Sequence, residues 1–174
     1  LLRSMLFVPG DSEKKLAHGM QVPADALVLD LEDSVDRGRK AEARELVAAF
    51  LARRLTRRVW VRVSAVDDPE HEADLASVVP AGPDGIVLPK CGGGKDVEQL
   101  HQLLDGMEAA LRLPVGGSRI IAVATETPGA VLNLGSYAGC SARLLGLMWG
   151  AEDLASALGA SANRRAGRYR APFD

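Results

Sequence analysis

The sequence predicts one α/β domain over residues 1–174, a TIM-type (β/α)₈ barrel that is incomplete, with about six strand–helix units present. Three observations support this fold. Apolar runs of strand length alternate with stretches of helical periodicity. The runs are almost continuously hydrophobic, as expected for parallel strands covered on both faces. Five of them end close to a charged residue, and parallel α/β enzymes collect their active sites at the carboxyl ends of their strands.

Six apolar runs account for the expected strands. Pro9-Gly10 ends the first of them, and Pro89-Lys90 closes the fourth. The third, around Val61-Arg62-Val63, contains the β-branched residues that strands favour. We expect strands at residues 5–8, 26–31, 59–63, 85–88, 120–125 and 144–148.

Between these runs, apolar side chains recur at the spacing of amphipathic helices. Asp11 or Ser12 can cap the first helix, and Pro69 suits the first turn of the third. The helices are expected at residues 12–20, 41–55, from 69 onward, and 96–113. We expect no strand after Ala157, because residues 161–170 are polar, rich in arginine and interrupted by Gly167.

Six strand–helix units match the pitch of a barrel that normally needs about 250 residues. We therefore expect that the C-terminal βα units are missing from this chain, the alternative being an open six-stranded sheet. An open barrel edge exposes unpaired strand groups and favours association. The expected assembly is a homo-oligomer, either a trimer or a hexamer.

Composition excludes several classes of protein. The chain has 47% hydrophobic and 25% charged residues and a formal net charge of −2, with its basic residues scattered, so nucleic-acid binding is not expected. No stretch of the sequence has the 18 or so uninterrupted apolar residues of a membrane span. Cys91 and Cys140 lack the spacing of a zinc site and are interpreted as reduced thiols. We expect a cytoplasmic protein that binds small molecules.

A glycine-rich stretch after the fourth predicted strand invites comparison with phosphate-binding loops. Gly92-Gly93-Gly94-Lys95 lacks both the leading glycine and the Ser or Thr after lysine that a P-loop requires. As a flexible loop with exposed amides it could still contact a phosphorylated carrier. His18, His71 and His101 have no partners at metal-ligand spacing and are interpreted as ordinary histidines.

Two carboxylates are candidate metal ligands. Glu126 follows the fifth apolar run and Asp153 follows the sixth, so both are expected at the same end of the barrel. Two carboxylates that converge repel each other and resist desolvation unless a cation lies between them. Oxygen ligands with no His or Cys nearby favour Mg²⁺. The alternative is that Glu126 or Asp153 merely caps the helix that follows.

Arg62 is the candidate substrate-binding cation. Strand alternation points it to one face of the sheet, where its guanidinium suits bidentate binding of a carboxylate. The alternative is an internal salt bridge to Asp30, Glu32 or Asp33, and both arrangements are compatible in an empty enzyme. Among the three acids, one could position Arg62 or the waters of a metal and another could accept a proton, while at least one is expected to be solvated.

Six short motifs, in order from residue 3 to about Gly159, carry a resemblance to a known family. The chain resembles the citrate lyase β-subunit-like proteins of the HpcH/HpaI aldolase superfamily. One departure is Ser64, which stands where an asparagine is common in these proteins. The motifs are Arg3-Ser4 with Leu6-Phe7-Val8-Pro9-Gly10, Leu29-Asp30-Leu31-Glu32-Asp33-Ser34-Val35, Val61-Arg62-Val63, Ile86-Val87-Leu88-Pro89-Lys90, Glu126-Thr127-Pro128-Gly129 and Gly150-Ala151-Glu152-Asp153-Leu154.

The resemblance implies a TIM barrel with Mg²⁺ at Glu126 and Asp153 and the substrate carboxylate at Arg62, with Glu126 also near the substrate. It implies a lyase that cleaves or forms a carbon–carbon bond in a hydroxyacyl-CoA thioester of the citryl-CoA or malyl-CoA type. The products would be an acyl-CoA and a 2-oxo acid such as oxaloacetate or glyoxylate. Glu32 and Asp33 are the candidate proton donors. Two alternatives stay open: a non-catalytic subunit that binds metal and oxo acid, and a class II aldolase that acts on free 2-oxo acids.

Overall fold

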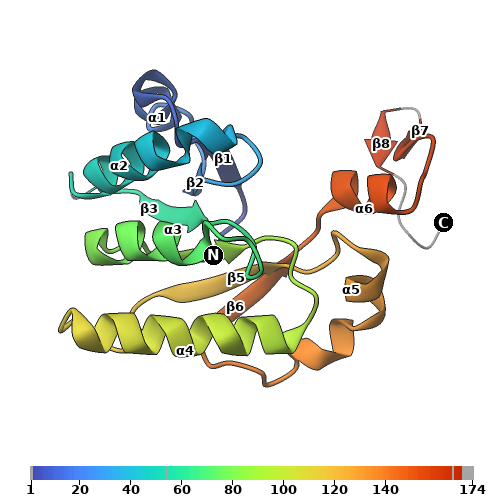
Figure 1. Ribbon diagram of the computed structural model, residues 1–174. Coiled ribbons are helices and arrows are strands. Elements are labelled where there is room, and N and C mark those ends of the chain that lie inside the picture. The colour runs from blue at the N-terminus through green and yellow to red at the C-terminus, as the bar shows by residue number, and fades with distance from the viewer. Residues whose placement is uncertain (1, 54, 166, 170–174) are drawn as a thin grey trace.

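Six parallel strands form one sheet in which each strand pairs with its neighbours in the sequence (Figure 1). The computed structural model describes residues 2–53, 55–165 and 167–169. Sequential parallel order, with a helix after each strand, is the winding of a (β/α) barrel, and the sheet is open between β1 and β6. The strands are β1 (Met5–Pro9), β2 (Ala26–Asp30), β3 (Arg58–Arg62), β4 (Gly85–Leu88), β5 (Arg119–Val123) and β6 (Leu144–Met148).

All six strands lie within two residues of the predicted runs, so the predicted α/β fold is confirmed. The helices are α1 (Glu13–Gly19), α2 (Lys40–Leu51), α3 (His71–Val78), α4 (Gly94–Ala110), α5 (Pro128–Leu132) and α6 (Ala151–Ala157), with 3₁₀ turns at Arg37–Arg39, Val79–Ala81 and Leu134–Tyr137. Ser12 caps α1 as expected, because its hydroxyl accepts a hydrogen bond from the Lys15 amide at 3.4 Å.

Three helix boundaries differ from the prediction. The helix after β3 begins at His71 rather than near Pro69, because the Asp68 carboxylate accepts a hydrogen bond from the Glu70 amide and holds a turn there. α2 ends at Leu51, and Leu55 packs against the core from the connection to β3. α4 ends at Ala110 rather than at residue 113, because the chain turns sharply at Arg112, whose φ is +56°.

The two faces of the sheet carry separate apolar clusters. On one face, alternate strand residues pack against the helices; Val61, for example, is fully buried with Val47 of α2. On the other face the buried cluster contains strand side chains only, namely Ala26, Val28, Trp60, Val87, Ile121 and Val123. A face that the strands cover by themselves is the inner face of a barrel. The alternation predicted around Arg62 is confirmed, because Trp60 lies on this inner face and Val59, Val61 and Val63 lie on the helix side.

The segment after β6 stands apart from the sheet, as Figure 1 shows for α6, β7 and β8. β7 (Arg164–Arg165) and β8 (Arg168–Tyr169) form a two-stranded antiparallel ribbon, so the prediction of no strand after Ala157 is wrong. Gly167, at a φ of +77°, makes the tight turn between them, and two-residue strands have no hydrophobic pattern for the sequence to reveal. Among the described residues, no helix has the length and apolarity needed to cross a membrane.

Candidate active site at the carboxyl ends of the strands

Five charged side chains from successive strand ends define the site. Asp30 ends β2 and Arg62 ends β3, while Lys90, Glu126 and Asp153 follow β4, β5 and β6. In a parallel sheet these ends lie on the same edge, which is why residues far apart in the sequence meet here. From the sequence, Glu126 and Asp153 were predicted as metal ligands, Arg62 as the substrate-binding cation and Asp30 as a possible partner of Arg62. No role was predicted for Lys90.

Glu126 and Asp153 lie together, and neither caps a helix. Glu126 is only 4% exposed, its carboxylate accepts a hydrogen bond from the Lys90 backbone amide, and it lines the same cavity as Asp153. Burial first, and then the contact with Asp153, raises the pKa of Glu126 to about 7. Thr127 caps α5 and Gly150 occupies the capping position of α6, so the capping alternative is wrong.

Gly150 makes room for Glu126. A Cβ atom at position 150 would lie 2.3 Å from Cγ of Glu126 and 3.1 Å from Cγ1 of Val123. The Gly150 amide donates a hydrogen bond of 2.9 Å to the Thr125 hydroxyl, which fixes the turn from β6 into α6 beside β5. The absence of a side chain here therefore lets the two carboxylates approach each other.

Arg62 is held by Asp30 in a bidentate pair. Its Nε and Nη2 atoms donate to the two Asp30 oxygens, each at 2.7 Å, and Nη1 lies 3.1 Å from Oε2 of Glu32. Burial opposes ionisation of Asp30, but the bonds from Arg62 outweigh it, so the pKa of Asp30 is lowered. The Phe7 ring lies under the guanidinium, with 4.9 Å between Cζ and the ring centroid. The internal salt bridge weighed from the sequence is thus present, and Arg62 also lines a cavity.

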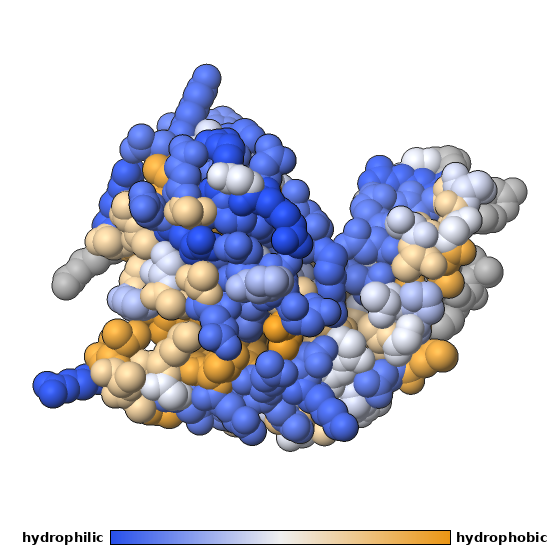
Figure 2. Space-filling model, in the orientation of Figure 1, coloured by the Kyte–Doolittle hydropathy of each residue, from blue (hydrophilic) through white to orange (hydrophobic). Residues whose placement is uncertain are grey.

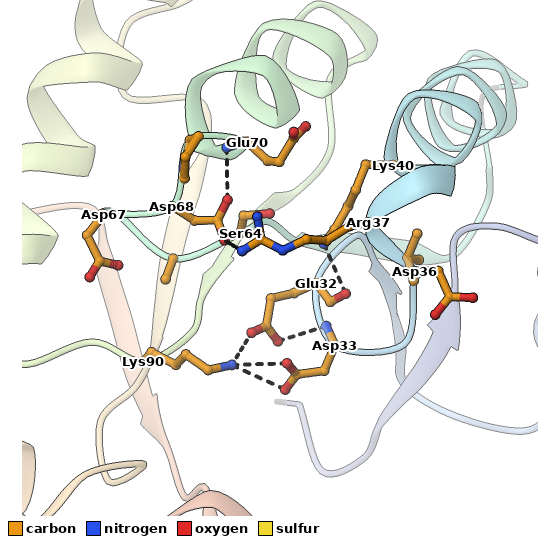
Figure 3. A pocket seen from close by; sticks show the side chains of 13 residues that line it. Glu32, Asp33, Asp36, Arg37, Lys40, Ser64, Asp67, Asp68, Glu70 and Lys90 are labelled. Atoms are coloured by element: carbon orange, nitrogen blue, oxygen red, sulfur yellow. Dashed lines mark hydrogen bonds and ion pairs between the residues drawn. The ribbon is translucent and has the colours of Figure 1, made fainter.

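Lys90 joins the acids of the β2 loop to the β5 strand end. Its Nζ atom donates to Glu32 and lies 3.1 Å from Oδ1 of Asp33, as Figure 3 shows, while its amide donates to Glu126. Burial raises the pKa of Glu32, although the nearby Lys90 and Arg62 act to lower it. Burial also opposes ionisation of Asp33, but hydrogen bonds from Glu32 and Lys90 outweigh it, so the pKa of Asp33 is lowered. Only the position of Lys90 at the end of an apolar run could have suggested it from the sequence.

The glycine loop after Lys90 uses two of its amides in internal hydrogen bonds. The Gly92 amide donates to the Asp96 carboxylate at 2.7 Å, and the Gly94 amide donates to the Ser136 hydroxyl at 2.9 Å. A Cβ atom at Gly93 would lie 2.2 Å from Nδ2 of Asn133, so this glycine leaves room for the Asn133 side chain. The loop therefore does not present these amides to a phosphate group.

A cavity of about 480 Å³ lies between the strand ends and α6, where the surface in Figure 2 is hollowed. Arg62, Glu126 and Asp153 line it together with the apolar side chains of Phe7 and Trp149. A second, more polar cavity is lined by Glu32, Asp33 and Lys90 together with Asp67 and Asp68 (Figure 3).

Among the described residues, no group of three or more His, Cys, Asp or Glu side chains could hold a metal ion. A metal at Glu126 and Asp153 would therefore have two protein carboxylates, with water or substrate in its other positions. Mg²⁺ prefers this arrangement, because it takes oxygen ligands and gives up its waters reluctantly. The repulsion between the buried Glu126 carboxyl group and the half-buried Asp153 carboxyl group is a second feature that a cation would relieve.

Comparisons with a family model and with curated proteins both find the citrate lyase family. The family model described as HpcH/HpaI aldolase/citrate lyase matches residues 3–168. The citrate lyase subunit beta of Escherichia coli K12 is 38% identical over 153 residues, which cover 87% of this chain and 50% of that protein. The (3S)-malyl-CoA thioesterase of Cereibacter sphaeroides KD131 is 33% identical over 159 residues, which cover 90% and 51%. The chain thus spans about half the length of these curated relatives.

Solved structures of Mycobacterium tuberculosis proteins have the same fold. The citrate lyase beta subunit complexed with oxaloacetate and magnesium matches with a TM-score of 0.76 and 30% identity, over 95% of this chain and 66% of that one. Protein CitE in complex with magnesium, acetoacetate and coenzyme A matches with a TM-score of 0.77 and 29% identity, over 98% and 58%.

Proposed function

The chain belongs to the HpcH/HpaI aldolase/citrate lyase family, and we propose that it provides the metal- and oxo-acid-binding part of a carbon–carbon lyase. The reaction would cleave or form a hydroxyacyl-CoA thioester of the citryl-CoA or malyl-CoA type. Cleavage would yield an acyl-CoA and a 2-oxo acid, oxaloacetate or glyoxylate. The observation that carries this proposal is that the paired carboxyl groups of Glu126 and Asp153 line one cavity with Arg62.

Each residue of the site has a role in this proposal. Glu126 and Asp153 would hold Mg²⁺, which when bound polarises the keto oxygen of the oxo acid. Arg62, already oriented by Asp30, would bind the second carboxylate of the substrate through its remaining N–H groups. Glu32 and Asp33 are the candidate proton donors to the thioester fragment, since both lie at the carboxyl end of β2 beside Lys90 and Arg62. Phe7 and Trp149 would exclude water from the cavity.

The first test is calorimetric titration of oxaloacetate and glyoxylate into the purified protein. Binding is expected with Mg²⁺ present and is expected to disappear when EDTA removes the metal, because Arg62 alone provides too few contacts. Binding that is identical in EDTA would contradict a metal-dependent site. Titration of Mg²⁺ without oxo acid serves as the control for metal binding itself.

A second candidate reaction is hydrolysis of the thioester, since one relative is a (3S)-malyl-CoA thioesterase. The two reactions give different products from malyl-CoA: carbon–carbon cleavage gives acetyl-CoA and glyoxylate, and hydrolysis gives free CoA thiol and malate. Chromatography of the products would distinguish them. Cleavage of free hydroxy acids without CoA would favour the class II aldolase, and binding without turnover would favour a non-catalytic subunit.

Gly150→Ala is expected to weaken Mg²⁺ binding at least about tenfold, because the added methyl group displaces Glu126. Overpacking of this kind typically costs about 1–3 kcal/mol of stability. The matched control is Gly106→Ala, since position 106 lies within α4 with no neighbouring atom within 4 Å of the added carbon. That change should raise stability by about 0.5–1 kcal/mol and leave Mg²⁺ binding intact. Equal Mg²⁺ affinities in both variants would contradict the role of Gly150.

A further inference from the structure

We propose that Lys90 is a positioning residue that lets Glu32 release Arg62 when an oxo acid binds. The proposal rests on the function proposed above and assigns a role to a residue that lies outside the metal and substrate ligands named there. In it, the Lys90 ammonium keeps the Glu32 carboxylate compensated while the substrate carboxylate takes the place of Glu32 on Arg62.

Glu32 is shared between two cations. Its Oε1 atom accepts from Nζ of Lys90, and its Oε2 atom lies 3.1 Å from Nη1 of Arg62. The Glu32 side chain is only 8% exposed, so water does not replace a lost partner freely. A buried carboxylate without a cation is strongly disfavoured. Glu32 can therefore leave Arg62 only if the contact with Lys90 persists.

Nη1 is the part of Arg62 that is able to change partner. Nε and Nη2 are committed to Asp30, which is 1% exposed and also accepts hydrogen bonds from the amides of Glu32 and Ser34. The Asp30 pair is thus fixed from several sides. Nη1 is held less firmly, because it lies 3.1 Å from Oε2 of Glu32 and 3.9 Å from Oδ2 of the half-exposed Asp33. An incoming carboxylate that binds Arg62 competes with Glu32 for Nη1.

The backbone conformation of Lys90 indicates that the surrounding structure fixes the position of this residue. Its φ is +50°, in the left-handed region that residues other than glycine rarely adopt. In this conformation the amide points to Glu126 while the side chain reaches Glu32, 58 residues earlier in the chain. Such backbone outliers persist only where the surrounding structure determines them, and they cluster at functional sites. Lys90 therefore touches both the proposed metal ligand and the acid that restrains Arg62.

The test compares oxaloacetate binding, in saturating Mg²⁺, between the wild type and three variants. Lys90→Gln removes the ammonium and is expected to bind oxaloacetate about tenfold more weakly, because Glu32 then retains Arg62. Lys90→Arg keeps the charge and is expected to restore most of the affinity. In the double variant Lys90→Gln/Glu32→Gln the competing charge is gone, so affinity is expected to return to within about threefold of the wild type.

The matched control is Lys95→Gln, an exposed lysine in the first turn of α4 with no ion pair to another described residue. Glu32→Gln with Lys90 in place gives a second, independent test, and oxaloacetate is expected to bind at least as tightly as to the wild type. Mg²⁺ affinity, measured without oxo acid, is expected to stay the same in all variants, which a general loss of structure would not allow.

Three results would overturn the inference while leaving the proposed function in place. One is wild-type affinity in Lys90→Gln, another is a double variant no better than Lys90→Gln, and the third is a large loss of affinity in Glu32→Gln alone. Failure of the wild type to bind oxaloacetate with Mg²⁺ would instead overturn the proposed function, and this inference with it.

Discussion

Glu126→Gln is expected to abolish most of the Mg²⁺-dependent binding of oxaloacetate. Replacing partners of metal ligands typically costs about 10- to 100-fold in metal affinity, so removing one of the two proposed carboxylate ligands is expected to cost at least about 100-fold. Glutamine has nearly the same shape and can still accept the hydrogen bond from the Lys90 amide. The loss should therefore come from charge and metal affinity and not from misfolding.

Calorimetry with Mg²⁺ alone and with Mg²⁺ plus oxaloacetate measures this effect directly. Thermal unfolding in the absence of metal is expected to show no loss of stability. The neutral glutamine side chain does not repel the Asp153 carboxylate as a second carboxylate would. Glu72→Gln, an exposed position in α3, provides the matched control and should bind as the wild type does. Retention of Mg²⁺-dependent binding in Glu126→Gln would remove Glu126 from the metal site.

The second large effect is expected on the free energy of unfolding, at an ion pair outside the candidate active site. Glu108 of α4 and Arg143 before β6 are 1% and 2% exposed and form a buried ion pair, with 2.6 Å between Nη2 and Oε2. Glu108 also accepts hydrogen bonds from the Gly116 and Ser118 amides at 2.7 and 2.8 Å. Removing Glu108 leaves the buried Arg143 guanidinium with only the half-exposed Asp105 carboxylate as a charged partner, so Glu108→Gln is expected to destabilise the fold by up to about 3–5 kcal/mol.

Denaturant unfolding of Glu108→Gln beside Asp105→Asn tests this estimate. Asp105 also pairs with Arg143, but its side chain is 43% exposed, so its replacement is expected to destabilise the fold much less than that of Glu108. If the two variants were equally stable, the burial of Glu108 would not be the source of the effect.

The same pair predicts how stability depends on pH. Burial opposes ionisation of Glu108, but the bonds from Arg143 and the two amides outweigh it and lower its pKa to about 2. The unfolded chain, with an ordinary pKa near 4.5, takes up the proton first on acidification. The stabilisation is therefore complete above about pH 4.5 and is lost as the pH falls towards 2. Unfolding curves of the wild type should show this slope, and those of Glu108→Gln should show less of it.

Sequence patterns were sufficient to predict most of the strands and helices. Strands buried on both faces are continuous apolar runs, so their number, order and approximate ends could be read directly. Helix ends were less predictable, since Asp68 and the left-handed Arg112 act through local backbone geometry that periodicity does not report. The β7–β8 ribbon was missed because two-residue strands around Gly167 leave no hydrophobic period.

The sequence by itself predicted which kinds of residue would meet at the candidate site. Acidic and basic residues that follow apolar strands must gather at one edge of a parallel sheet, and oxygen ligands without His or Cys favour Mg²⁺. Arg62 and Glu126 were therefore predicted to lie at this edge from their positions alone, and both line the cavity there.

Only the tertiary structure decided how these charges are paired. Asp30 holds two sides of the Arg62 guanidinium, and Glu32 lies between Arg62 and Lys90. Such pairings depend on side-chain direction and on a single backbone angle at Lys90, across loops separated by tens of residues. Neither hydrophobic periodicity nor motif spacing encodes that geometry, because it is fixed by packing between strands that are distant in the chain.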